Sequence, residues 1–411
     1  MAVSTVGVRR AQRRGALLLG PAFVAAIAYV DPGNVAANLT AGSRYGYLLL
    51  WVLVVANAMA VLVQYQSAKL GLVTGQSLPG VLGERLGRRS RLAFWVQAEL
   101  VAAATDIAEV VGGAIALNLL FGVPLALGGV IVGAVSMGLL STQNRYGQRR
   151  FEYVVVGLLA VITLGFLAGL VVAPPDARGV LSGLVPRFDG PDSVLLAASM
   201  LGATVMPHAI YVHSALARDR HGRAPDAGSL RRLLRATRWD VGVALVVAGL
   251  VNIGLLLLAA SGLRGVPGTD SIEGAYAAIV AALGLGIGIA FAVGLLASGL
   301  ASTSVGAYAG ATIMEGLLHR RVPLLVRRVV TLIPAVVLLG LGADPTWTLV
   351  VSQVVLSFGI PFAVIPLVAF TRSRALMGDA RNGPCLHAVL VAVVTLVVAL
   401  NLTLLALLLT T

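Results

Sequence analysis

Eleven apolar runs dominate this sequence, and nearly all of them are as long as a helix that crosses a lipid bilayer, which takes about 20 residues. The chain has 411 residues, of which 58% are hydrophobic and 11% charged. Its mean hydropathy of +0.94 excludes a pair of soluble domains. The sequence therefore predicts an all-α polytopic membrane protein. The expected spans are residues 16–41, 46–70, 92–119, 122–141, 152–174, 193–218, 239–262, 282–314, 328–342, 345–370 and 384–409.

The net charge of +13 comes from arginines that mark loops and do not form one basic face. We therefore expect no nucleic-acid partner. If the N-terminus is inside, 26 of the 30 Arg and Lys residues fall on the inner side, and only Arg44, Arg178, Arg187 and Arg264 fall outside. Because inner loops carry the excess of positive charge, this distribution predicts a cytoplasmic N-terminus and an outer C-terminus. The preference for Arg over Lys suggests the plasma or inner membrane of a bacterium.

The first span is interrupted at mid-depth by Asp31-Pro32-Gly33-Asn34. Pro32 has no N–H to bond the carbonyl of Ala28 four residues earlier, and Gly33 lets the chain turn. A broken helix is tolerated in lipid only where protein covers it or where it lines a cavity. We therefore expect a binding site here.

The sixth span repeats the interruption, since Pro207 follows Met206 and releases the carbonyl of Ala203. Five spans separate the two breaks, so the halves cross the membrane in opposite directions. This is the pattern of an inverted-topology repeat with a site between two discontinuous helices. The predicted organisation is a cytoplasmic N-terminus (1–15), a first five-helix repeat (16–174), a second, inverted repeat (193–371) and an eleventh helix (384–409).

The side chains and freed carbonyls at the two breaks describe a cation site. Asp31 offers a carboxylate, Asn34 an amide oxygen, and Ala28 and Ala203 main-chain oxygens. Oxygen ligands alone suit Ca²⁺ or Mg²⁺, whereas the thioether of Met206 adds affinity for softer divalent ions such as iron, manganese, cobalt or cadmium. Met206 is therefore the expected selectivity residue.

Three carboxylates lie in the otherwise apolar third span, at Glu99, Asp106 and Glu109. Spacings of seven and three place them along one helix face. Arg327 and Arg328, at the start of the ninth span, are available to pair with them. Ionisable side chains at such depth mark ion or proton paths, and a purely structural ion-pair network is the alternative.

These motifs together resemble the signatures of the Nramp divalent-metal transporters. The resemblance rests on the Asp31–Asn34 stretch, on Met206-Pro207-His208 followed by His213, and on residues 327–334. It implies a LeuT-type fold of five plus five helices and an eleventh, with helices 1 and 6 broken, and proton-linked uptake of Mn²⁺ or Fe²⁺.

The same resemblance implies roles for individual residues. The metal ligands would be Asp31, Asn34, Met206, Ala28 and Ala203, with Gln353 of the tenth span approaching the metal. The acids of the third span and the paired arginines of the ninth would carry protons away. Asp31 would bind metal when ionised and take a proton when metal leaves, and His208 would assist.

Two positions depart from the family pattern, Ala209 after Met-Pro-His and Gly359 before the proline of the tenth span. The remaining alternatives are a Na⁺-coupled organic-solute carrier of the same architecture, a passive metal channel, and a membrane metalloenzyme using His208 and His213. We expect no enzyme activity, no cofactor and no obligate protein partner beyond lipid. The single cysteine, Cys385, is expected to be a free buried thiol.

Overall fold

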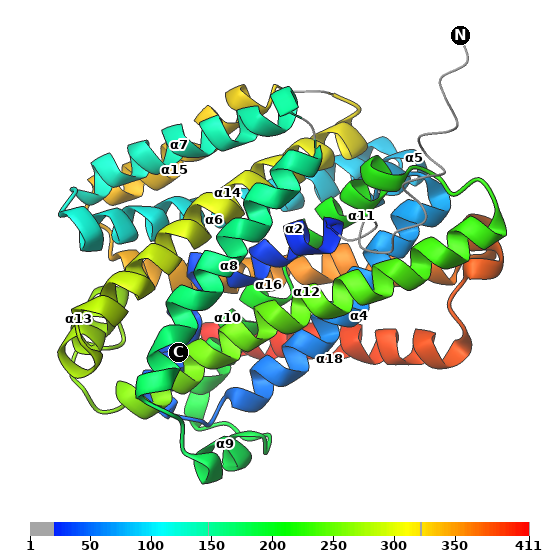
Figure 1. The fold of residues 1–411 in the computed structure, drawn as a ribbon. Coiled ribbons are helices and arrows are strands. Elements are labelled where there is room, and N and C mark those ends of the chain that lie inside the picture. Colours follow the sequence, from blue (N-terminus) through cyan, green and yellow to red (C-terminus); the bar gives the residue numbers. More distant parts are fainter. Residues whose placement is uncertain (1–19, 147, 321–322, 411) are drawn as a thin grey trace.

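The computed structural model describes residues 20–146, 148–320 and 323–410. The predicted N-terminal segment 1–15 and the first residues of the first span lie outside the described residues. Long helices run alongside one another through the molecule, and short helices cap their ends (Figure 1). Eight helical runs in the described part are long and apolar enough to cross a membrane.

The first span is a broken helix, as predicted. It consists of α2 (Pro21–Ile27), the 3-10 turn η2 (Ala28–Val30) and α3 (Pro32–Tyr45). Asp31 separates the halves in an extended conformation, with φ −69° and ψ 166°. The first helical segment ends before Pro32, because proline has no N–H to continue its hydrogen bonds. The second helix, α3, begins at Pro32, because proline suits the first position of a helix. Figure 1 places α2 near the centre of the molecule.

The sixth span is broken in the same way, into α10 (Gly190–Thr204) and α11 (Pro207–His221). Val205 and Met206 link the halves in non-helical conformations. Every residue from 196 to 217 is buried, because this part of the span lies inside the bundle next to α3, α4 and α16. The two breaks therefore lie in the interior, where neighbouring helices cover their exposed main-chain groups.

The other expected spans all coincide with helices. They are α4 (Leu50–Thr74), α6 (Arg88–Phe121), α7 (Leu125–Tyr146), α8 (Gln148–Val172), α12 (Ala227–Gly262), α14 (Leu285–Leu318), α15 (Leu324–Gly340), α16 (Pro345–Arg372) and α18 (Pro384–Thr410). The short elements are α5 (Leu78–Arg85), α9 (Ala177–Gly183), α13 (Ile272–Leu283), α17 (Arg374–Met377) and η3 (Gly378–Ala380).

Two expectations are corrected by the structure. Helix α12 starts at Ala227, twelve residues before the predicted span, because Asp226 caps it by accepting a 2.8 Å hydrogen bond from the Ser229 N–H. Cys385 is exposed and not buried. It lies in the first turn of α18, an edge helix that meets the rest of the protein mainly through α16 and α10.

Helices α6 and α14 form the most extensive packing pair, and α15 lies against α6 and α7. In Figure 1, α7 and α15 run side by side at one edge of the molecule. This arrangement brings the acidic third span (α6) against the paired arginines of the ninth (α15).

Candidate functional site

Asp31 is fully buried at the break of the first span. One carboxylate oxygen, Oδ1, accepts the main-chain N–H of Asn34 at 2.8 Å and the Asn34 side-chain amide at 2.9 Å. Asp31 therefore caps α3 while its other oxygen stays turned toward α16. A charged group this deep requires partners or a counter-ion.

Asn34 connects the two breaks. Its Nδ2 donates to the carbonyl oxygen of Ala203 at 2.8 Å, across 169 positions of sequence. The carbonyl predicted to be released by Pro207 is therefore turned toward the first break. Asn34 Oδ1, in contrast, is buried and accepts no hydrogen bond, so an unused acceptor lies beside the Asp31 carboxylate.

Gln353 of α16 completes this group. Its Nε2 lies 3.4 Å from Asp31 Oδ2, and its Oε1 is a second buried acceptor without a partner. A side chain at Gly33 would overlap the Gln353 amide. Glycine at the break is therefore required for α16 to approach Asp31, in addition to letting the chain turn. Buried acceptors are rarely left unpaired, so two of them beside a carboxylate indicate a place for a cation.

The remaining predicted ligands lie at the same two breaks. Met206 is fully buried at the start of α11, and Ala28 is buried at the start of η2. At the first break, however, the carbonyls that accept side-chain hydrogen bonds belong to the two residues after Ala28. Tyr29 O accepts from Asn252 at 2.6 Å, and Val30 O accepts from Ser298 at 2.5 Å.

Sequence reasoning did not identify Asn252 and Ser298 as supports of the first break. Both are buried polar side chains in apolar helices, α12 and α14. A polar residue within an apolar helix is the sequence signal that could have identified them, since a buried polar group in a membrane helix needs a partner. The partner, a carbonyl freed from its helix, lies more than 220 residues away in sequence.

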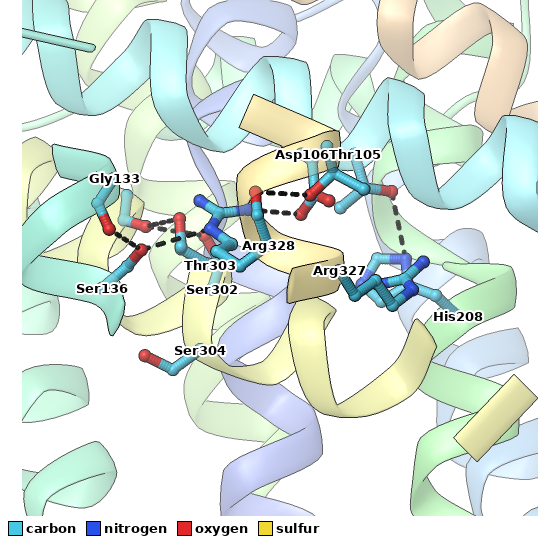
Figure 2. A network of polar contacts seen from close by, with 12 residues as sticks. Thr105, Asp106, Gly133, Ser136, His208, Ser302, Thr303, Ser304, Arg327 and Arg328 are labelled. Carbon is cyan, nitrogen blue, oxygen red and sulfur yellow. Dashed lines mark hydrogen bonds and ion pairs between the residues drawn. The ribbon is translucent and has the colours of Figure 1, made fainter. Parts of the chain in front are cut away.

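The third-span acids pair with the arginines of α15. Arg327 meets Glu99 at 2.7 Å, and Arg328 meets Asp106 at 2.8 Å. Arg328 is fully buried and also donates to Ser136 Oγ at 3.2 Å. Figure 2 shows Arg328 between Asp106 and Ser136. Both arginines therefore pair with acids of the third span, and the structure adds which acid each one meets.

Glu109 differs from the other two acids because no arginine of the described chain lies within ion-pair distance of it. It is fully buried, and its carboxylate faces Gly306 of α14, where an added Cβ would lie 3.1 Å from Oε1. Glu109 lies one turn along α6 from Asp106, on the same face. Of the three acids in α6, Glu109 alone is thus left without an arginine partner among the described residues.

The two histidines of α11 have separate partners. His208 Nδ1 lies 3.3 Å from Thr105 Oγ1, next to Asp106 in α6 (Figure 2). His213 Nδ1 lies 2.7 Å from Gln64 Oε1, and Gln64 in turn donates to the Tyr29 hydroxyl at 2.6 Å. His208 therefore lies on the α6 side of α11, whereas His213 links α11 to α4 and the first break.

Comparison with known proteins identifies the family. The sequence model of the Nramp family, described as natural resistance-associated macrophage protein-like, matches residues 22–407. The chain belongs to the Nramp family. A similar relative is the divalent metal cation transporter MntH of Mycobacterium tuberculosis, 64% identical over 365 residues, which covers 89% of this chain and 85% of the relative. MntH of Bacillus subtilis is 45% identical over 395 residues, which covers 94% and 92% of the two chains.

Solved structures agree with the family and confirm the fold. The Nramp chain superposes on the Eremococcus coleocola manganese transporter with a TM-score of 0.85 and 32% identity, covering 98% of this chain and 88% of the other. Mhp1 shares the fold at 18% identity and a TM-score of 0.62, covering 86% and 78%. MhsT does so at 13% identity and 0.61, covering 93% and 98%. The predicted LeuT-type architecture in a multi-pass membrane protein is therefore confirmed.

Proposed function

We propose that this Nramp protein imports divalent transition-metal ions, Mn²⁺ or Fe²⁺, together with protons. The observation that carries the proposal is the arrangement at the two breaks. A buried carboxylate at Asp31 lies beside two unused acceptors, Asn34 Oδ1 and Gln353 Oε1, and Asn34 joins this group to Ala203 in the second break. A cation would neutralise the carboxylate and use both acceptors.

The ligand chemistry supports a transition metal as the transported substrate. Asp31, Asn34, Gln353 and the main-chain oxygens of Ala28 and Ala203 are hard ligands, which alone would favour Mg²⁺ or Ca²⁺. Met206 is the soft donor at the second break, and a thioether adds affinity for later divalent metals. The names of the relatives, divalent metal cation transporter and manganese transporter, support the same substrate class. They describe transporters and not enzymes.

The row of acids along α6 supports coupling to protons. Asp31 would hold metal while ionised and receive a proton when metal leaves. From there the path would run through Glu109 to the Asp106–Arg328 and Glu99–Arg327 pairs, which lie progressively closer to the start of α6. His208, beside Thr105, is placed to assist. Buried ionisable residues in a membrane bundle are typical of such routes.

The arginine distribution supports the orientation. With 26 of 30 Lys and Arg residues on one side, the N-terminus would face the cytoplasm of a bacterium and the C-terminus would lie outside. In that orientation the start of α6 lies on the cytoplasmic side, and Glu99 is nearer to that end than Asp106 or Glu109. Protons taken up at the site would then leave toward the cytoplasm, and the proposal requires no bound cofactor.

The experiment is metal uptake into proteoliposomes that contain the purified full chain. Uptake of Mn²⁺, Fe²⁺, Cd²⁺, Mg²⁺ and Ca²⁺ would be compared with and without a pH gradient that is acidic outside, using protein-free liposomes as the control. We expect Mn²⁺, Fe²⁺ and Cd²⁺ to accumulate above the external concentration only with the gradient. Equilibration without accumulation would indicate a channel, and uptake that depends on Na⁺ in place of protons would contradict the coupling.

A further inference from the structure

A groove on the lipid-facing surface runs between α6 and α16. Its volume is about 700 Å³, within the range of pockets that hold an organic ligand. Its walls are apolar apart from one arginine at the end and one glutamine on the floor. The apolar wall residues are Leu92, Val96, Leu100, Val355, Phe358 and Phe362.

The length of this α6–α16 groove matches one leaflet of a bilayer. It extends along α6 from Arg89 to Val101, and these thirteen residues rise about 18 Å in a helix. Half of the hydrocarbon core of a bilayer is about 15 Å thick. The groove thus begins at headgroup level, at the start of α6, and ends near the midplane beside Gly359.

The headgroup end of the groove is basic. Arg88 and Arg89 are exposed, and neither forms an ion pair within the described chain. Arg85 lies over the ring of Phe370, with its guanidinium carbon 5.8 Å from the ring centroid. The nearest acid in sequence, Glu84, is held by Gln76 at 2.6 Å. Basic pockets between membrane helices on the cytoplasmic side are suited to anionic lipid headgroups.

The deep end of the groove lies where α6 and α16 approach each other at Gly359. A Cβ at Gly359 would lie 2.5 Å from Val101 Cγ2, 3.0 Å from Gln97 Nε2 and 3.1 Å from Pro207 Cγ. A side chain at residue 359 would therefore displace Val101 at the end of the groove and press on the start of α11.

We propose that the α6–α16 groove binds an anionic phospholipid of the cytoplasmic leaflet. The phosphate lies at Arg89, and one acyl chain follows the groove as far as Gly359. This site is separate from the metal site, and it depends on the proposed function only for the choice of leaflet. A bound chain would end beside Gly359, where an added Cβ would lie 3.1 Å from Pro207 at the second break.

The test is native mass spectrometry of the detergent-solubilised full chain, titrated with phosphatidylglycerol or with phosphatidylcholine of the same acyl chains. We expect one phosphatidylglycerol to be retained in preference to phosphatidylcholine. Arg89→Gln should weaken its retention roughly fivefold, the effect of one basic residue near a lipid headgroup. Arg374→Gln is the control, since Arg374 is exposed and lies on the same side of the membrane outside the groove.

The acyl part is tested with Val355→Trp, which fills the groove, against Val351→Trp on the same helix. The two valines are similarly exposed, at 40% and 39%, but only Val355 lines the groove. Loss of retention in Val355→Trp alone supports the proposal. Equal retention of both lipids by the unmodified chain, or equal losses in the matched variants, would overturn it. The lipid comparison on the unmodified chain decides the question even if a variant fails to fold.

Discussion

The Asn34 side-chain amide donates a 2.8 Å hydrogen bond to the carbonyl oxygen of Ala203, and so joins the two broken helices directly. The same amide donates to Asp31 at 2.9 Å. Because one side chain bonds both breaks, a displacement of α10 relative to α3 changes the surroundings of the Asp31 carboxylate. The geometry around Asp31 therefore depends on the relative position of the two halves of the chain. A transporter whose site opens in turn to the two sides of the membrane requires such a dependence.

Removing the charge of Asp31 should abolish metal uptake. Asp31→Asn keeps an acceptor for the Asn34 N–H, since Asn and Asp cap helices about equally well, but it cannot neutralise a divalent cation. Mn²⁺ binding by calorimetry and uptake in proteoliposomes should both fall to background. Asp226→Asn is the control, because Asp226 caps α12 through an equivalent bond to Ser229, outside the spans. Retained uptake in Asp31→Asn would remove the proposed site.

Met206→Ala should weaken discrimination against Ca²⁺ and Mg²⁺. The loss should be on the order of one to a few kcal/mol, as for other single contacts, and it would appear as stronger competition by Ca²⁺ for Mn²⁺ uptake. Met200→Ala is the matched control, since Met200 is equally buried in α10 and leaves a similar cavity. If Ca²⁺ competition is unaltered in Met206→Ala, the selectivity role is wrong.

Glu109→Gln should impair proton coupling more than metal binding. Glu109 has no arginine partner among the described residues, so neutralising it leaves no buried charge unpaired. The pH dependence of Mn²⁺ uptake should flatten, while the Mn²⁺ affinity changes less than the coupling does. Equal losses of binding and coupling would instead indicate a structural network.

Asp106→Asn should lower stability, in addition to any effect on proton coupling. It leaves Arg328, which is fully buried, without its carboxylate at 2.8 Å. Breaking a buried ion pair from one side costs roughly 3–5 kcal/mol. The free energy of unfolding in detergent should therefore fall well below that of Glu109→Gln. A similar stability for the two variants would show that water reaches Arg328.

The outer pair of Arg44 and Asp270, 2.7 Å apart, gives a pH prediction. The hydrogen bond from Arg44 lowers the pKa of Asp270 below its ordinary value. Because the pKa of Asp270 is lower in the folded state, its ionisation stabilises the folded protein at pH values above the ordinary pKa of about 3.9. This stabilisation is lost as the pH falls through the lowered pKa. The pair is half-exposed, so the effect is small and screened by salt.

This prediction is measured as the difference in Tm between the unmodified chain and Asp270→Asn at low ionic strength. The difference should be present at pH 6 and should shrink by pH 3. When Arg44→Gln is present in both proteins, Asp270→Asn should change the Tm at neither pH. A difference that grows on acidification would contradict the assignment.

Much of the fold was predictable because its signals are local. A proline and polar neighbours at mid-span predicted both breaks, and the arginine pairs and acids predicted the contact between α6 and α15. The supports of the first break were not predictable, because Asn252 and Ser298 reach carbonyls more than 220 positions away. The close approach of Gln353 at Gly33 likewise depends on how α16 packs, for which the sequence carries no local pattern.

The exposure of Cys385 and the start of α12 at Ala227 could not be predicted from residue types alone. Burial of free cysteine is a tendency of residue type, whereas α18 lies at the edge of the bundle and leaves Cys385 exposed. The charged stretch before residue 239 was assigned to a loop. The structure continues α12 through it from Ala227, because the stretch consists mostly of Ala, Leu and Arg, which are strong helix formers.

If the two breaks form one metal site, Met206 is a ligand of the bound ion. X-ray absorption spectroscopy of the purified chain loaded with Mn²⁺ or Cd²⁺ tests this ligand set. We expect one sulfur among oxygen ligands in the unmodified chain and in Met200→Ala, and oxygen or nitrogen ligands alone in Met206→Ala. A sulfur-free shell in the unmodified chain, or a sulfur that persists in Met206→Ala, would contradict it.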